Sequence, residues 1–131
     1  MMRYLLIVIA LFLSSSAFAK EIDFSELITD QDGVQIMDCA GVGCSGPPLT
    51  LGIVSLRALT AQFDDDKNLS GEDKFKRGEL ALRVYKGGVI DLTAEDIATI
   101  KKLVAKGYGP LIVVKAWMML DPQSAKGHAS K

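Results

Sequence analysis

Apolar residues recur at helical spacing most regularly between Leu92 and Pro122. The first half of this stretch places one apolar residue every three or four positions, at Ile97, Ile100, Leu103 and Val104. This spacing forms a single apolar face on a helix, with lysines opposite. From Leu111 to Leu120 the chain is apolar nearly all round, which is typical of a buried helix. The pattern predicts two helices joined by a Gly-Tyr-Gly-Pro corner.

Local signals mark the ends of these two helices. Thr93 is a good N-cap, and Asp96 three residues later completes a partial capping box. Gly107 is expected to end the first helix in a left-handed conformation. Pro110 suits the first turn of the next helix, where its missing N–H costs nothing. The helix is expected to end at Asp121, because the residue before a proline avoids the helical region.

Two earlier segments also show helical periodicity. Thr50 can cap a helix from about Leu51 to Gln62, and Ser70 can cap one from Glu72 to Lys86. In the helix from Glu72 to Lys86, we expect five side chains to face the core: Phe75, Leu80, Ala81, Val84 and Tyr85. The charged side chains are expected to face water, and these are Lys74, Lys76, Arg77 and Glu79.

The segment before these helices indicates β structure. Residues from Glu21 to Thr29 alternate loosely, and the following Asp30-Gln31-Asp32-Gly33 contains an Asp-Gly turn signal. Val34 to Met37 would form the returning strand. The predicted fold is therefore mainly α, a four-helix domain with a small N-terminal β-hairpin. An α+β arrangement is the alternative.

Composition narrows the function classes. The chain has 131 residues, with 15 Lys and Arg against 16 Asp and Glu. This length suits one small domain. The near-neutral charge disfavours nucleic-acid binding, which normally requires a basic excess on one face.

The N-terminus has the features of a secretory signal peptide. Arg3 gives a positive region, Leu5 to Leu13 an apolar region, and Ala17-Phe18-Ala19 a small-x-small cleavage site. We predict a signal peptide at 1–19, a domain at 20–122 and a disordered tail at 123–131. The mature protein would be periplasmic or secreted, without a stable membrane span. An uncleaved anchor is the alternative.

The only two cysteines, Cys39 and Cys44, bracket a short segment of small residues. Export would place them in an oxidising compartment, so we predict that they form a disulfide. Their spacing differs from the Cys-x-x-Cys of redox motifs. No histidine lies near them in sequence, so a zinc site is not indicated.

One loop resembles a calcium site in part. Asp64, Asp66, Asn68 and Ser70 fall at alternating ligand positions of a calcium loop. However, Leu69 stands where the loop needs glycine, and Phe75 where it needs a bidentate glutamate. A solvated interhelical loop is the preferred interpretation, and calcium binding the alternative.

Four segments of the chain resemble a known group of proteins, and these are Ile28 to Gly33, Pro48 to Gly52, Asn68 to Glu72, and Gly109 to Leu120. With these segments, residues 21–122 resemble a group of short, functionally uncharacterised phage and prophage proteins. The chain departs from that group in its signal peptide and in the insert holding the two cysteines. The resemblance implies a phage origin and a role in protein contacts, and it supplies no catalytic residues.

The sequence contains no paired acid and base, no nucleophile beside a base and no glycine-rich phosphate loop. We therefore expect a small exported protein-interaction module rather than an enzyme, acting without a cofactor on a protein partner that remains to be identified. Trp117 and Met118 are the candidate interaction residues, because both residue types are enriched in interface cores. Self-association and a calcium-binding module are left open as alternatives.

Overall fold

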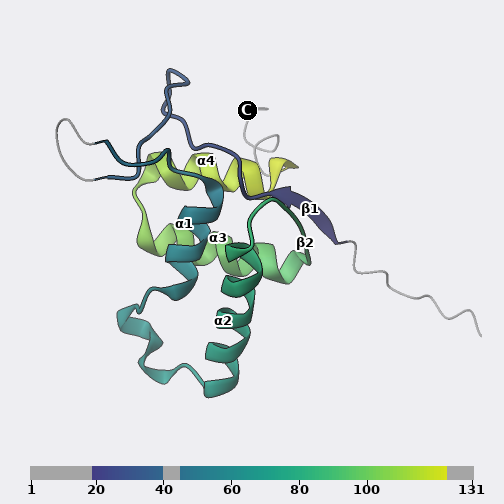
Figure 1. Cartoon of the computed structure of the whole chain (residues 1–131). Helices are drawn as coiled ribbons and strands as arrows, with labels where there is room; N and C mark the ends of the chain where they lie inside the picture. Colours follow the sequence, from purple (N-terminus) through teal and green to yellow (C-terminus); the bar gives the residue numbers. More distant parts are fainter. Residues whose placement is uncertain (1–18, 40–44, 124–131) are drawn as a thin grey trace, which may run out of the picture.

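Four α-helices and a two-stranded antiparallel sheet form the regular structure of residues 19–39 and 45–123, the part of the chain that this computed structural model describes (Figure 1). The prediction of a mainly α fold with a small β element is confirmed for this part. The elements follow one another as β1 (Lys20–Asp23), α1 (Leu51–Thr60), a 3-10 helix (Asp64–Asn68), α2 (Gly71–Tyr85), β2 (Val89–Leu92), α3 (Ala94–Gly107) and α4 (Pro110–Leu120).

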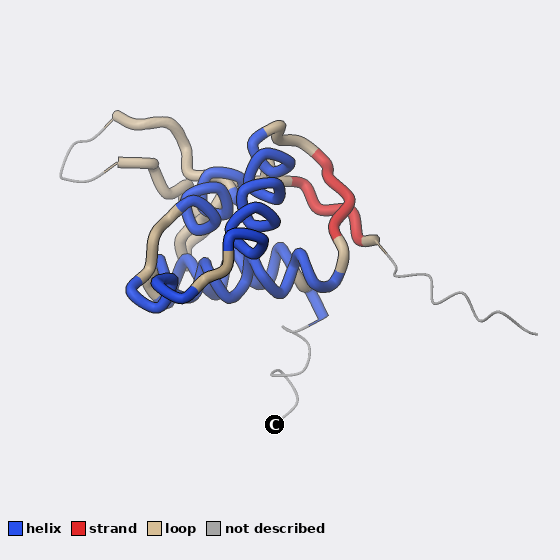
Figure 2. Tube along the Cα trace, turned by 90° about the horizontal axis from the view of Figure 1, so that it is seen from below, coloured by secondary structure: helices blue, strands red, loops and turns tan. Residues whose placement is uncertain are grey.

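The helices form two pairs that lie across one another. α1 packs against α2, and α3 packs against α4, while α1 also contacts both α3 and α4. Figures 1 and 2 show α1 and α2 standing against the α3–α4 pair, with the small sheet at one end of the domain. α1 is therefore the central helix, because it contacts each of the other three.

The sheet is not the predicted hairpin. β1 pairs antiparallel with β2, with Lys20 opposite Leu92 and Asp23 opposite Val89. The predicted returning strand, Val34 to Met37, makes only isolated bridges, such as Met37 with Pro48. The reason is burial: Ile22 and Leu92 on the paired strands reach the core, whereas Val34 and Met37 remain exposed.

The predicted turn at residues 30–33 does form. The Asp30 amide donates to the Val34 carbonyl at 2.8 Å, and the Asp30 carboxylate accepts from the amides of Asp32 and Val34. Gly33 has φ of 81°, which suits glycine. The turn reverses the chain. Beyond it, the two arms pair through one isolated β-bridge, between Thr29 and Gln35, and form no hairpin strands.

The helix caps agree with the sequence prediction. The hydroxyls of Thr50, Ser70 and Thr93 each accept a hydrogen bond from the amide three residues later. At α3 the capping box is complete, because the Asp96 carboxylate accepts from the Thr93 amide at 3.3 Å. Pro110 is the first residue of α4. These local bonds satisfy amides that lack partners within the helix.

The prediction for Gly107 is wrong. Gly107 is the last residue of α3 and has no positive φ, and the residue that caps the helix, Tyr108, is extended. The chain must stay extended through Gly109, because the residue before a proline disfavours the helical region. Left-handed glycines instead follow α2, at Gly87 and Gly88, both with φ of 71°.

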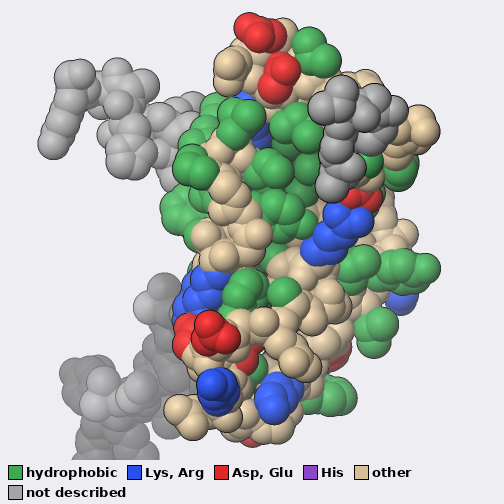
Figure 3. Space-filling model, turned by 90° about the vertical axis from the view of Figure 1, so that its left-hand side faces the viewer, with side chains coloured by type: hydrophobic (Ala, Val, Ile, Leu, Met, Phe, Trp, Pro, Cys, Tyr) green, Lys and Arg blue, Asp and Glu red, His purple; other side chains and the backbone are tan. Residues whose placement is uncertain are grey.

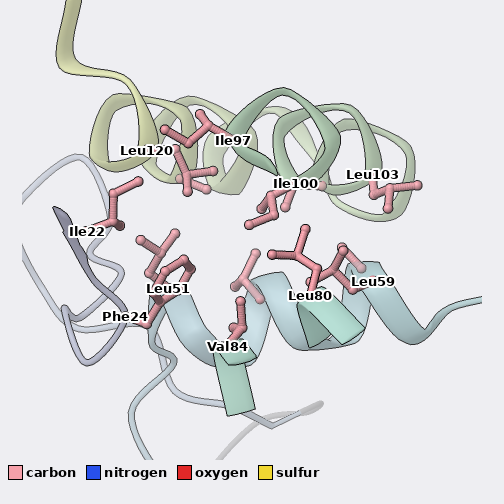
Figure 4. Close-up of a cluster of buried hydrophobic side chains, with 14 of the residues drawn as sticks. Ile22, Phe24, Leu51, Leu59, Leu80, Val84, Ile97, Ile100, Leu103 and Leu120 are labelled. Atoms are coloured by element: carbon pink, nitrogen blue, oxygen red, sulfur yellow. The ribbon is translucent and has the colours of Figure 1, made fainter. Parts of the chain in front are cut away.

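The core lies where the two helix pairs meet the sheet (Figure 4). Phe24, directly after β1, is 1% exposed. Its carbonyl accepts from the Gly52 amide at 2.8 Å. A Cβ on Gly52 would lie 2.9 Å from that carbonyl oxygen, so glycine allows the close approach of α1. Phe24 therefore fixes the N-terminal segment against the start of the central helix.

The predicted faces of α2 are partly wrong. Leu80, Ala81 and Val84 are buried as expected, but Phe75 and Tyr85 point outward and are exposed. Arg77 takes a position toward the interior, where its side chain is 12% exposed. α2 therefore has one apolar side in the core and a second apolar side in solvent.

Candidate interaction surface

The outer side of α4 carries three large apolar side chains that the domain leaves uncovered. Leu111, Val114 and Met118 are between 39% and 53% exposed. Their spacing of three and four residues places them on one side of the helix. The opposite side carries Ala116 and Leu120, both fully buried. We call Leu111, Val114 and Met118 the α4 stripe.

Trp117, the other predicted interaction residue, lies mainly against α3. Its indole N–H donates to the Lys101 carbonyl at 3.0 Å. The Lys101 ammonium lies 4.5 Å from the centre of the indole ring, in cation–π geometry. The ring is half-buried. Trp117 thus fixes the angle of α4 on α3, and Met118 beside it belongs to the exposed stripe.

Polar contacts at the end of α4 hold the helix in place. The Lys101 ammonium also lies 3.3 Å from the Asp121 carboxylate, directly after α4. The Lys20 ammonium donates to the Leu120 carbonyl at 3.4 Å and so connects β1 to the same end. α4 is therefore anchored to both α3 and β1.

Further apolar side chains lie on the same side of the molecule. Figure 3 shows hydrophobic side chains gathered on the upper half of the face that looks left in Figure 1, where α4 begins and residues 30–38 lie. Val34 and Met37 from that segment are exposed. Contiguous exposed apolar surface is typical of interaction sites.

A polar cluster ties this segment to the helices. The Arg57 guanidinium of α1 pairs with both oxygens of the Asp38 carboxylate, at 2.5 and 2.8 Å. Asp38 raises the pKa of Arg57, with a smaller contribution from Tyr108 at the α3–α4 corner. Burial raises the pKa of Tyr108. A bidentate pair of this kind fixes geometry as well as charge, so the segment before Cys39 is held against α1.

The predicted Cys39–Cys44 bond cannot be followed in the structure, because Cys44 lies outside the described residues. Residues 1–18 of the predicted signal peptide (1–19) and residues 124–131 of the predicted tail (123–131) also lie outside them. The bond, the cleavage and the disordered tail therefore stay predictions.

The calcium-like loop is a short 3-10 helix whose central carboxylate is already engaged. Asp66 accepts from the Arg77 guanidinium at 3.0 and 2.9 Å and from the Phe63 amide at 2.9 Å. The next carboxylate, that of Asp65, pairs with Lys106, and this hydrogen bond lowers the pKa of Asp65. Asp64, Asn68 and Ser70 remain on the loop, with Ser70 capping α2.

Neither this loop nor the rest of 19–39 and 45–123 brings three acidic, histidine or cysteine side chains together in a way that could hold a metal ion. The Arg77 guanidinium also donates to the carbonyls of Leu59 and Ala61, at 3.0 and 2.9 Å. Arg77 therefore pairs with the Asp66 carboxylate and binds the carbonyls at the end of α1, which is a structural role.

Two open hollows border this region. One, of about 650 Å³, lies between the end of α1, the 3-10 helix and α2, and includes Phe63, Asp66 and Arg77. The other, of about 480 Å³, lies between α2 and α3 and is lined mainly by charged side chains of both signs. In the first hollow, the Asp66 carboxylate and the Arg77 guanidinium are already paired with one another.

Sequence reasoning missed Leu111 and Val114. The run from Leu111 to Leu120 is apolar nearly all round, so periodicity alone does not separate a buried side from an exposed one. Within the described part of the chain, no helix combines the length and apolar character that crossing a membrane requires.

Comparisons of the chain with protein-family models, with curated proteins and with solved structures found no match.

Proposed function

We propose that this protein is a small exported protein-interaction module that contacts its partner through the α4 stripe. The observation that carries the proposal is the exposure of Leu111, Val114 and Met118 on one side of a helix whose other side is in the core. When a partner covers apolar groups exposed together on one side of a helix, their removal from water favours binding.

The stripe has the composition of a binding surface rather than of a catalytic one. α4 contains no acidic residue, and Lys115 is its only charged side chain. Methionine adapts its shape readily and is enriched in interface cores. A partner that offers an apolar groove or an amphipathic helix fits this surface. The resemblance of residues 21–122 to short phage proteins also supports a contact role.

Replacing one stripe residue by lysine is expected to weaken partner binding while leaving the fold intact. We expect Val114→Lys and Met118→Lys each to weaken binding at least ~10-fold, because truncating a central interface residue costs about 1–2 kcal/mol or more. A photo-crosslinking amino acid at Val114 identifies the partner in the exporting cell. Titration of the purified partner by calorimetry then measures the affinities.

The matched control for these variants is Val89→Lys, at an exposed position of β2 outside the α4 stripe. Its melting temperature should be similar to those of the other variants, and its affinity for the partner should equal that of the unchanged protein. Normal binding by both α4 variants would exclude the α4 stripe as the contact surface. A loss of folding in the α4 variants would show that the stripe is structural.

Export is tested separately by the intact mass of the protein recovered from an exporting bacterium. The expected mass begins at Lys20, because Ala17-Phe18-Ala19 provides the cleavage site. Alkylation of Cys39 and Cys44 is expected only after reduction, because an oxidising compartment favours the disulfide. A mass that retains Met1, with both thiols alkylated without reduction, would place the protein inside the cell.

A further inference from the structure

A second apolar stripe lies on the outward side of α2. Phe75, Leu82 and Tyr85 are between 69% and 74% exposed, more than any residue of the α4 stripe. Their spacing of seven and three residues places them on one side of the helix. The other side of α2 carries Leu80 and Val84 in the core, so the helix cannot rotate to bury both sides. We call Phe75, Leu82 and Tyr85 the α2 stripe.

The stripe has an open gap at its centre. Gly78 lies between Phe75 and Leu82 on the same side, and a Cβ added there would meet no atom within 4 Å. Bare backbone at this point lets another helix approach closely. α2 stands at the front of the domain in Figure 1, so a facing helix has access along its length.

Charges of opposite sign border one edge of the stripe. Glu72, Glu79 and Lys86 follow one another at seven-residue intervals, with acids toward the N-terminus and a base at the C-terminus. When two helices pack antiparallel about a two-fold axis, each edge faces the same edge of the other helix. Glu72 of each copy then lies opposite Lys86 of the other.

We propose that the α2 stripe is a dimer interface, formed with the α2 of a second copy of this chain packed antiparallel around Gly78. In this arrangement Phe75 of each copy packs against Leu82 of the other, beside the bare backbone of Gly78. A two-fold axis makes each contact twice. Antiparallel helix dipoles also attract. This interface is independent of the α4 stripe and of the partner proposed for it.

The arrangement has one unfavourable contact. Glu79 lies next to the proposed axis, so the two Glu79 carboxylates of a dimer lie near one another. Repulsion between these two negative charges would weaken the dimer. The geometry therefore implies that Glu79→Gln tightens the dimer, which a contact with an unrelated partner would not require.

Sedimentation velocity of the mature chain from micromolar to millimolar concentration tests the dimer. We expect reversible monomer–dimer exchange, and Leu82→Glu should raise its dissociation constant at least ~10-fold, since each dimer loses two apolar contacts. Met118→Glu, a matched change on the α4 stripe, should leave the dissociation constant unchanged. Circular dichroism confirms that both variants are folded. A chain that stays monomeric throughout, or a dimer that responds to Met118→Glu and not to Leu82→Glu, overturns the proposal.

A charge exchange tests the antiparallel orientation. Glu72→Lys alone and Lys86→Glu alone each place like charges opposite one another, and both should weaken the dimer. The double variant Glu72→Lys/Lys86→Glu restores opposite charges and should restore the wild-type dissociation constant. A double variant as weak as the sum of the two single changes overturns the antiparallel arrangement.

Discussion

Replacing Phe24 by alanine is expected to lower the free energy of unfolding by about 4 kcal/mol. Phe24 is 1% exposed and packs between the end of β1 and the start of α1. Removing a buried phenylalanine costs about 3–5 kcal/mol, because the lost contacts leave a cavity that the surroundings only partly fill. A domain of this size has a total stability of about 5–15 kcal/mol, so the variant is close to unfolding. Urea denaturation followed by circular dichroism measures the change.

The matched control is Phe75→Ala, which removes the same atoms from an exposed position on α2. Measured at low protein concentration, it should alter the unfolding free energy by about 0.5 kcal/mol or less. Phe24→Leu should recover much of the loss, because it refills most of the cavity. Equal effects of Phe24→Ala and Phe75→Ala would mean that Phe24 is not in the core.

Replacing Arg77 by methionine is expected to cost about 3 kcal/mol of stability. The guanidinium holds the Asp66 carboxylate and the carbonyls of Leu59 and Ala61, and both charged side chains are largely buried, at 12% and 16% exposed. Methionine keeps the apolar stem but leaves a charge and two carbonyls without their donor. Breaking one side of a buried ion pair costs about 3–5 kcal/mol, and the remaining exposure places the expected value at the low end. Urea denaturation again provides the measurement.

Two variants separate this clamp from a general charge effect. Lys76→Met removes the neighbouring charge, whose pair with Glu72 at 3.4 Å is exposed, and should cost about 0.5 kcal/mol or less. Arg77→Met/Asp66→Asn should be less destabilised than Arg77→Met, because no unpaired carboxylate remains. If Arg77→Met is as stable as Lys76→Met, the guanidinium contributes nothing to the fold.

Local chemistry in the sequence was enough to predict the four helices. Thr50, Ser70 and Thr93 each mark a helix start through a bond made within three residues. Pro110 marks the start of α4 in the same local way. Because these signals depend only on near neighbours, they do not require knowledge of the tertiary structure.

The partner of β1 could not be predicted in this way. The turn at Gly33 is local and forms as predicted, but the strand that pairs with β1 comes after α2. Its selection depends on burying Ile22 and Leu92 together, which is a tertiary effect. The sequence therefore predicts an antiparallel pair and assigns the wrong second strand.

Which sides of α2 and α4 face the core, and which face solvent, could not be predicted from the sequence either. Phe75 and Leu82 are as apolar as the core residues of α2, so composition does not separate the buried side from the exposed one. Arg77 is charged but lies inward, because Asp66 and two carbonyls of another element satisfy it. Ser55, with no hydrogen-bond partner for its hydroxyl in the described structure, is likewise buried on the central helix. These placements depend on contacts between elements that are distant in sequence.

The pairing of β1 with β2 has a consequence for the order of events during synthesis and transport. A chain that crosses a membrane from its N-terminus emerges with Lys20 to Asp23 long before Val89 to Leu92, because α1 and α2 lie between them. Until the later strand arrives, the residues around Lys20 have no sheet partner. If the protein is exported as proposed, a signal peptidase meets this region before it is paired in the sheet. The last strand to emerge then closes the N-terminus of the mature domain.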